Sequence, residues 1–283
     1  MLALLGGTVT MPFGLGATAY SLDQSYTDAD GDGIPDSLER SVEFNDRVTG
    51  VFGADQFSGF DPERRDLLVD ARYIGETTVS EETKSALVGL FQANGIHLQW
   101  LDYPECYDRA AFERKYGYNA REILWSPWSF YHQTIERQLK NVAFQLIVVP
   151  GFGEGPHYGK LYSPWTKFDS GLGYVNGFNT GNRAVVTSRD DFETESKLIL
   201  HEITHYALCH STDPTNTGVM GTSEELDLLA SEWEALRTGL GSIRDTTGFD
   251  VAFQRCLWAD ILSSRNLPDQ LARSVDCAGC RTV

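Results

Sequence analysis

The pentapeptide His201-Glu202-Ile203-Thr204-His205 constrains this chain more than any other stretch. Helical side chains four residues apart lie on the same face, so His201 and His205 can direct two imidazoles at one point. Neutral imidazole is a preferred zinc ligand, and a catalytic zinc keeps three protein ligands and an open position for water. Glu202 lies beside that point without needing to bind the metal. The spacing therefore predicts a zinc site on a helix, with Glu202 as the general base.

The residues before the pentapeptide favour a helix. Acidic side chains crowd the segment that begins at Asp190, where the dipole of a helix stabilises negative charge. The apolar run at residues 198–200 then leads into the histidines, as expected for a buried helix that carries a site. The alternative is a helix whose histidines only pack or face solvent. That alternative does not require Glu202, or a further histidine at His210.

The sequence after this helix extends the motif. A third histidine, His210, is followed by a segment containing Pro and Gly that runs to Met220. With this extension the stretch resembles the metzincin metalloproteases, in which an extended H-E-x-x-H motif supplies three histidine ligands and a later methionine turn lies under the metal. The resemblance implies a zinc-dependent endopeptidase. The zinc ligands would be His201, His205 and His210, the general base Glu202 and the methionine of the turn Met220.

The match departs from the metzincin pattern at the third histidine. The family has a glycine after the second histidine, where the chain leaves the helix, whereas this chain has Ala207 and Leu208. Its third histidine also comes one residue early. On a continuous helix, His210 would lie about 140° from the face that carries His205. It can bind the same metal only if the helix breaks near Leu208, which the Pro- and Gly-containing run just after His210 favours.

A downstream carboxylate is the alternative third ligand. Glu224 or Glu225 could reach the zinc from a second helix, an arrangement that would resemble the gluzincins. Both could instead be first-turn acids behind a helix cap at Thr222 or Ser223. A different class of function is a non-catalytic, metal-binding surface protein. It would have a closed site with four protein ligands, for example with Cys209 or Glu224 added.

Residues 28–39 form a second motif, D-x-D-x-D-G-x-x-D-x-x-E. Calcium takes about six to eight oxygen ligands, and a loop of about 12 residues supplies them from alternate side chains, one backbone carbonyl and a final bidentate Glu. The residues at those places are Asp28, Asp30, Asp32, the Ile34 carbonyl, Asp36 and Glu39. The segment resembles the calcium loops of EF-hands, dockerins and thrombospondin type 3 repeats. It predicts a structural calcium ion in an N-terminal cap; the alternative is a solvated acidic turn.

The charge balance limits the class of partner. The chain has 283 residues and a net charge of -17, and arginines outnumber lysines. An acidic, lysine-poor surface is common in proteins that work in high salt, so we expect a halophilic protein. The charge argues against nucleic acid and anionic membranes as partners. A peptide or protein substrate and a monomeric state are expected.

The ends of the chain and its domain boundaries complete the prediction. Residues 1–19 carry no charged side chain and end in small residues, as in an atypical or truncated signal segment without its basic region. This favours a secreted or cell-surface protein. No stretch is apolar enough to insert into a membrane. The predicted division is a signal segment at 1–19, a calcium-loop cap and linker at 20–65, a zincin-like domain at 66–265 and a cysteine-containing tail at 266–283.

The order of predicted elements indicates the fold class. Strands are expected at residues 67–74, 96–101, 142–149 and 184–187, with an edge strand and loops within 151–177. Helices are expected at 81–94, capped by Ser80, and at about 223–237 and 248–264, with helical insertions in 105–140. This order resembles the metzincin N-terminal subdomain. The expected fold is α+β and zincin-like, with a mixed, mostly parallel sheet, an active-site helix and a smaller helical C-terminal subdomain.

Overall fold

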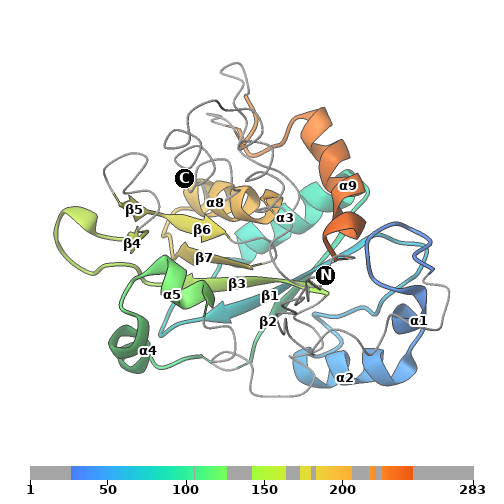
Figure 1. The fold of residues 1–283 in the computed structure, drawn as a ribbon, viewed down its shortest axis with the longest axis horizontal. Coiled ribbons are helices and arrows are strands. Elements are labelled where there is room, and N and C mark those ends of the chain that lie inside the picture. Colours follow the sequence, from blue (N-terminus) through green and yellow to red (C-terminus); the bar gives the residue numbers. More distant parts are fainter. Residues whose placement is uncertain are drawn as a thin grey trace, which may run out of the picture.

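A five-stranded sheet forms the centre of the molecule (Figure 1). The computed structural model describes residues 27–104, 106–125, 142–163, 173–179, 183–205, 217–220 and 225–244. The strand order is β2-β1-β3-β7-β6. The strands are β1 (Asp66–Tyr73), β2 (His97–Asp102), β3 (Ala143–Val149), β6 (Gly177–Asn179) and β7 (Arg183–Thr187). All pairs are parallel except β6 with β7, which confirms the prediction of a mixed, mostly parallel sheet.

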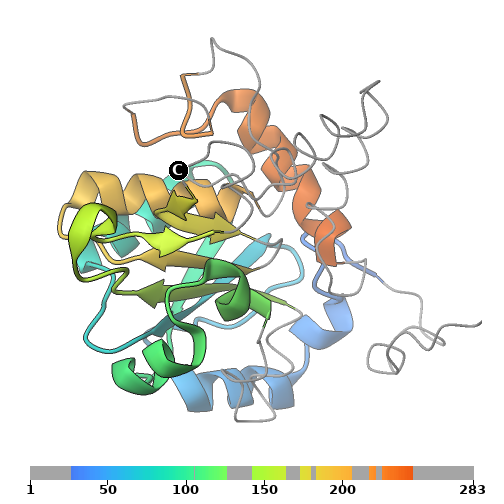
Figure 2. The ribbon, with the colours of Figure 1, turned by 60° about the vertical axis from the view of Figure 1, so that its left-hand side comes forward.

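One face of the sheet is covered by α3 (Glu81–Ala93) and α8 (Phe192–Thr204), with α9 (Ala230–Arg244) packed beside them (Figures 1 and 2). Alternate residues of β1 point to this face, because successive strand side chains point to opposite sides. Phe91 of α3 meets Trp233 of α9 edge to face, with ring centroids 5.1 Å apart. The three helices and this face of the sheet therefore share one core.

The opposite face is covered by shorter helices: α2 (Val42–Phe52), α4 (Arg109–Tyr116) and α5 (Ala120–Trp125). The remaining short elements are α1 (Asp36–Glu39), η2 (Gly155–His157), and a small sheet of β4 (Leu161–Tyr162) and β5 (Tyr174–Val175). Leu68 of β1 packs on the α2 side, whereas Ile147 and Val185 pack on the side of α4 and α5. The sheet is thus a buried middle layer, as parallel sheets generally are. Among the described residues, no helix is both long and apolar enough to cross a bilayer.

The observed ends of α3 and α8 can be compared with the predicted capping residues. The Ser80 side chain accepts a hydrogen bond from the Thr83 N–H at 3.1 Å, and α3 ends before Gly95, whose φ is +76°. The helix predicted at 81–94 is therefore confirmed. Asp191 caps α8 in the same way, accepting from the Thr194 N–H at 2.8 Å.

The helix predicted to begin near residue 223 was wrong in its start. Residues 225–229 are not helical, and α9 begins at Ala230. The Glu232 carboxylate accepts from the Leu229 N–H at 2.8 Å, and the Asp227 carboxylate accepts from the Trp233 indole N–H at 3.0 Å. These two carboxylates therefore stabilise a first helical turn that begins several residues later than a cap at Thr222 or Ser223 predicted. The helix predicted at 248–264 lies outside the described residues.

Glu195 joins the two long helices. Its side chain is buried, and its Oε2 accepts from the Ser80 N–H at 3.1 Å, the Ser80 hydroxyl at 2.9 Å and the Thr83 hydroxyl at 2.7 Å. A carboxylate on α8 therefore completes the N-terminal cap of α3, where negative charge is favoured.

Replacing Glu195 with alanine is expected to lower the free energy of unfolding by about 2–4 kcal/mol, because charge-assisted hydrogen bonds are lost and buried donors are left unpaired. Thermal unfolding should show a Tm lower by roughly 5–10 °C. The matched control is Glu193→Ala, which removes an exposed acid of the same helix that pairs with Lys197. That variant should change the Tm little. An equal Tm for both variants would contradict the role given to Glu195.

Candidate active site

The C-terminal half of α8 brings His201 and His205 together. Both side chains are buried, and their Nε2 atoms lie 2.9 Å apart. The rings are nearly perpendicular, at 88°, with centroids 4.5 Å apart. Two nitrogen ligands of a tetrahedral zinc are about 3.3 Å apart, which a small outward turn of the rings would provide. The helix thus presents two ring nitrogens to one point, as the spacing predicted.

The segment after the site helix returns beneath His201. The His201 Nδ1 lies 3.0 Å from the main-chain oxygen of Val219. Since a carbonyl oxygen only accepts, Nδ1 carries the proton in this contact and Nε2 keeps its lone pair for a metal. Val219 and its neighbour Met220 are buried in the same core as α8. The Val219 N–H in turn donates to the Asp227 carbonyl at 2.9 Å, which ties this turn to the segment leading into α9.

Glu202, which follows His201 on α8, is fully buried. Neither carboxylate oxygen has a hydrogen-bond partner among the described residues, and burial raises the pKa of this carboxyl well above its ordinary value. A Cβ atom added to Gly177 of β6 would lie 2.4 Å from Glu202 Oε1 and 2.9 Å from its Cδ. Asn179, two residues along β6, donates from Nδ2 to the Glu202 main-chain oxygen at 2.7 Å. The edge strand therefore both holds the site helix and leaves room for this carboxylate.

These residues fit a divalent metal. Burying a carboxylate with no donor or counter-ion is unfavourable, and a cation held by the two imidazoles of the same helix would offset that cost for Glu202. Two neutral imidazoles suit zinc in particular.

The third ligand is not defined by the described part of the chain. His210, Cys209 and Glu224 lie outside the described residues. Glu225 is exposed, in a bend ahead of α9. His201 and His205 are thus brought together, Glu202 is buried on the same helix, and Met220 lies in the adjoining core.

Sequence reasoning missed Gly177 and Val219. Val219 acts through its main-chain oxygen, so its side chain gives no signal, and only its position next to Met220 could have drawn attention to it. Gly177 stood among several glycines in the same region, and nothing in the sequence distinguished it from a turn residue. Both become visible only when β6 and the returning turn are placed against α8.

No protein-family model matches the chain, and no curated protein matches it. Among solved structures it is similar to archaemetzincins. The archaemetzincin of Methanopyrus kandleri is 18% identical with a TM-score of 0.43, over 62% of this chain and 96% of that one. The archaemetzincin of Archaeoglobus fulgidus is 19% identical with a TM-score of 0.33, over 60% and 99%. A zinc-dependent peptidase of Methanocorpusculum labreanum is 17% identical with a TM-score of 0.34, over 62% and 98%.

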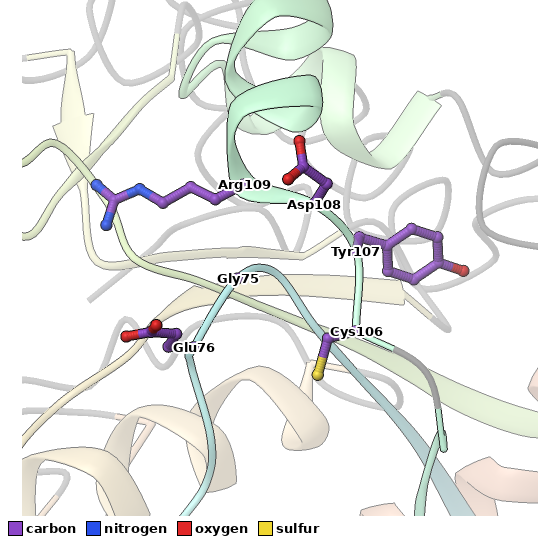
Figure 3. Close-up of a pocket in the computed structure, with 6 residues that line it drawn as sticks. All are labelled: Gly75, Glu76, Cys106, Tyr107, Asp108 and Arg109. Carbon is purple, nitrogen blue, oxygen red and sulfur yellow. The ribbon is translucent and has the colours of Figure 1, made fainter.

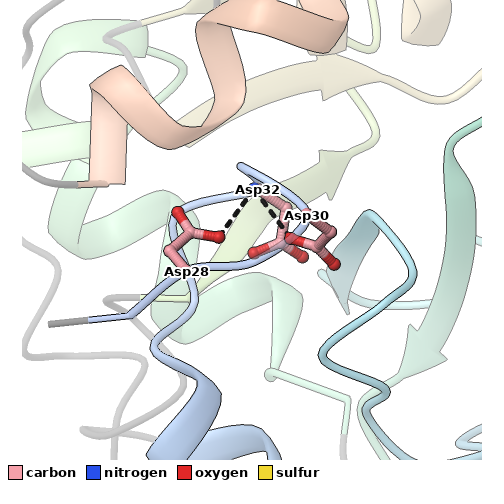
Figure 4. Close-up of side chains that lie close together, drawn as sticks. All are labelled: Asp28, Asp30 and Asp32. Carbon is pink, nitrogen blue, oxygen red and sulfur yellow. Dashed lines mark hydrogen bonds between the residues drawn. The ribbon is translucent and has the colours of Figure 1, made fainter.

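The loop of residues 28–39 forms a second group of possible metal ligands (Figure 4). Carboxylate oxygens of Asp28, Asp30 and Asp32 lie within 4.8 Å of one another, and so do those of Asp32, Glu39 and Asp66. Burial and the crowding of negative charge both raise the pKa of a carboxyl group. Desolvation and the neighbouring carboxylates raise the pKa of Asp30 to about 7 and that of Glu39 to about 8.

Main-chain donors shape this loop. Asp28 accepts from the Gly31 N–H at 2.9 Å and from the Gly33 N–H at 2.8 Å. Asp36, predicted as a calcium ligand, directs its carboxylate elsewhere: it accepts from the Ala29 N–H at 2.9 Å and pairs with Arg40 at 3.1 Å. Those contacts, which favour the charged form, lower the pKa of Asp36. Asp36 therefore holds the loop closed in this structure.

A cavity of about 560 Å³ is lined by residues of neither group (Figure 3). It opens where the chain leaves the carboxyl ends of β1 and β2, and none of its lining residues belongs to α8 or β6. The lining residues are Gly75, Glu76, Cys106, Tyr107, Asp108 and Arg109. None of these residues is a candidate zinc or calcium ligand.

Proposed function

We propose that this chain is a zinc-dependent metallopeptidase that hydrolyses peptide bonds. The observation that carries the proposal is the convergence of the His201 and His205 Nε2 atoms, 2.9 Å apart, on the helix that also carries Glu202, whose buried carboxylate has no hydrogen-bond partner among the described residues. Imidazoles hold the metal, and the carboxylate is the only group of the set left for proton transfer.

Each residue of the site has a separate role in the proposed reaction. A bound zinc would polarise the scissile carbonyl and lower the pKa of the attacking water. Glu202 takes a proton from that water and passes it to the leaving amine. The Val219 carbonyl keeps His201 in the tautomer that offers Nε2. Burial of all three side chains excludes bulk water from the proton transfer.

His210 is proposed as the third ligand, with Met220 as structural support of the site. The bounds of α8 favour His210, because this residue needs a helix that ends soon after His205. The helix ends at Thr204, with His205 as its C-cap. The alternative, in which Glu224 or Glu225 supplies the ligand, would make the site gluzincin-like.

The edge strand offers a place for the substrate. Within the described sheet, β6 pairs only with β7, so its outer side faces no other described strand. An extended peptide can add to such an edge through main-chain hydrogen bonds. Gly177 and Asn179 contact Glu202 from the same strand, so a peptide along β6 would pass close to the general base.

Zinc content, measured by elemental analysis together with peptidase activity, tests the proposal. We expect about one zinc per chain in the wild type and loss of both zinc and activity in His205→Ala and His210→Ala. Glu225→Ala and the control His157→Ala, a histidine stacked on Tyr174, should keep both. Loss in Glu225→Ala in place of His210→Ala would establish the gluzincin-like alternative. A zinc-loaded wild type that hydrolyses no peptide would favour the non-catalytic metal-binding protein.

A further inference from the structure

We propose that the loop of residues 28–39 binds one calcium ion, and that this ion fastens the loop to the first residue of β1. The side chains assigned as ligands are those of Asp28, Asp30, Asp32 and Glu39. The site stands apart from the histidine pair and does not depend on peptidase activity.

Glu39 points to a cation independently of the acidic cluster. The residue is only 2% exposed, and neither of its carboxylate oxygens has a hydrogen-bond partner among the described residues. A ligand oxygen of Glu39 lies within 4.8 Å of those of Asp32 and Asp66. Asp30 also has a buried oxygen, Oδ2, without a partner. A carboxylate that is buried, unpaired and surrounded by others is unfavourable in its charged form, and a cation bound among them offsets that cost.

The number and kind of ligands suit calcium. Glu39 can supply both oxygens, as the last residue of such loops does, and calcium accepts about six to eight oxygens in a flexible geometry. Asp28 and Asp32 already accept main-chain N–H groups, but a carboxylate has about four lone-pair sites and can do both. The Ile34 main-chain oxygen has the position of the carbonyl ligand. Magnesium is smaller and demands a near-ideal octahedron, which a bidentate carboxylate does not fit well.

Asp66 connects the site to the sheet and is not itself assigned as a ligand. Its carboxylate accepts from Arg64 Nε at 3.1 Å and from Gln99 Nε2 at 3.2 Å, and contacts His97 Nδ1 at 2.8 Å. Its main-chain N–H donates to Asp32 Oδ2 at 2.7 Å. A proposed ligand is therefore hydrogen-bonded directly to the start of β1.

The loop also shares a hydrophobic core with the sheet. Ile34, inside the loop, is fully buried. It belongs to one cluster with Phe44, Val48 and Phe52 of α2, Leu68 of β1 and Leu101 of β2. The ligands and this core share the same short segment. When the ion is released, repulsion among the carboxylates should therefore destabilise the packing of the whole hydrophobic cluster. Calcium is thus expected to stabilise the full chain and not the loop alone.

Calcium titration of the full chain, freed of metal and given one equivalent of zinc, tests the proposal. Isothermal titration calorimetry with CaCl₂ should show one ion per chain. Glu39→Gln and Asp30→Asn should each weaken binding at least about tenfold. At about 100 times Kd, calcium should raise the wild-type Tm by roughly 5–10 °C, and this increase should be lost in Glu39→Gln. In calcium-free buffer, Glu39→Gln should unfold at the same temperature as the wild type or higher, because a buried, unpartnered acidic group is gone from a cluster of carboxylates.

The matched control is Glu43→Gln, an equal change of charge at a carboxylate that is 80% exposed on α2. It should bind calcium like the wild type. No saturable binding to the wild type, or undiminished binding by Glu39→Gln, would overturn the site. An equal response to MgCl₂ would overturn its assignment to calcium. If Glu39→Gln does not fold, Asp30→Asn alone decides, since that carboxylate is only partly buried. Zinc content and peptidase activity are measured separately, so a failure of the calcium proposal can be distinguished from a failure of the proposed peptidase function.

Discussion

Replacing Glu202 with glutamine is expected to lower kcat/KM for peptide hydrolysis by a factor of roughly 100 to 10 000 while the zinc content stays unchanged. Glutamine has nearly the same volume and fits the space that Gly177 leaves, so the fold should survive. An amide cannot take a proton from water, so the reaction would lose its general base. The loss should therefore be in kcat rather than in metal binding. Zinc analysis and initial-rate kinetics on the same preparation measure both.

The control for this substitution is Glu193→Gln, which neutralises an exposed acid on the same helix. Its kcat/KM should equal that of the wild type. Full activity in Glu202→Gln would remove the general base from the mechanism. Loss of zinc in Glu202→Gln would mean that Glu202 is itself a ligand, as in a closed, structural site.

Gly177→Ala is expected to reduce kcat about 100-fold without releasing zinc. The added Cβ would meet Glu202 Oε1 at 2.4 Å and Leu198 Cδ1 at 3.0 Å, so the carboxylate must move by about 1 Å. Displacing a catalytic group by that distance costs on the order of 100-fold in rate. The backbone of Gly177 is not left-handed, so alanine strains the site and not the strand. The control is Gly153→Ala, whose Cβ would meet its nearest neighbour, Arg109, at 3.8 Å.

Combining the two substitutions separates positioning from general loss of stability. If Gly177 acts only through Glu202, Gly177→Ala should lower kcat almost no further in the Glu202→Gln variant. The side chain that the added Cβ displaces is then no longer a general base. Additive losses, or an unchanged kcat in Gly177→Ala alone, would show that the close approach of β6 to α8 has no part in catalysis.

Much of the fold could be predicted because its signals are local. Ser80 with Gly95 delimited α3, and the buried run of β3 is apolar apart from Gln145. The same local reasoning failed at α9, where two plausible caps competed and the acids nearer Ala230 prevailed. It also failed for the second face of the sheet, since the helix α2 lies in a segment that was expected to be only cap and linker.

The candidate site divides in the same way. The histidine pair could be predicted because four residues on a helix make one turn, whatever the rest of the chain does. The groups that fix the site, Gly177, Asn179 and the Val219 carbonyl, reach α8 from separate segments, and contacts between distant segments leave no periodic trace. Asp36 is a related case. Its spacing predicts a ligand, and the structure adds two contacts that the spacing does not show: its carboxylate accepts from the Ala29 N–H and pairs with Arg40.

The contact between Asp32 and Asp66 spans 34 residues, whereas the one between Ser80 and Glu195 spans 115. Loop-closure entropy grows with the logarithm of that separation, so the longer closure costs about 1 kcal/mol more. During synthesis the acidic loop can dock on β1 long before α8 leaves the ribosome. The first half of the chain can then fold first and provide the surface on which the second half packs. The histidine pair would be completed late, after the surface that receives it has formed.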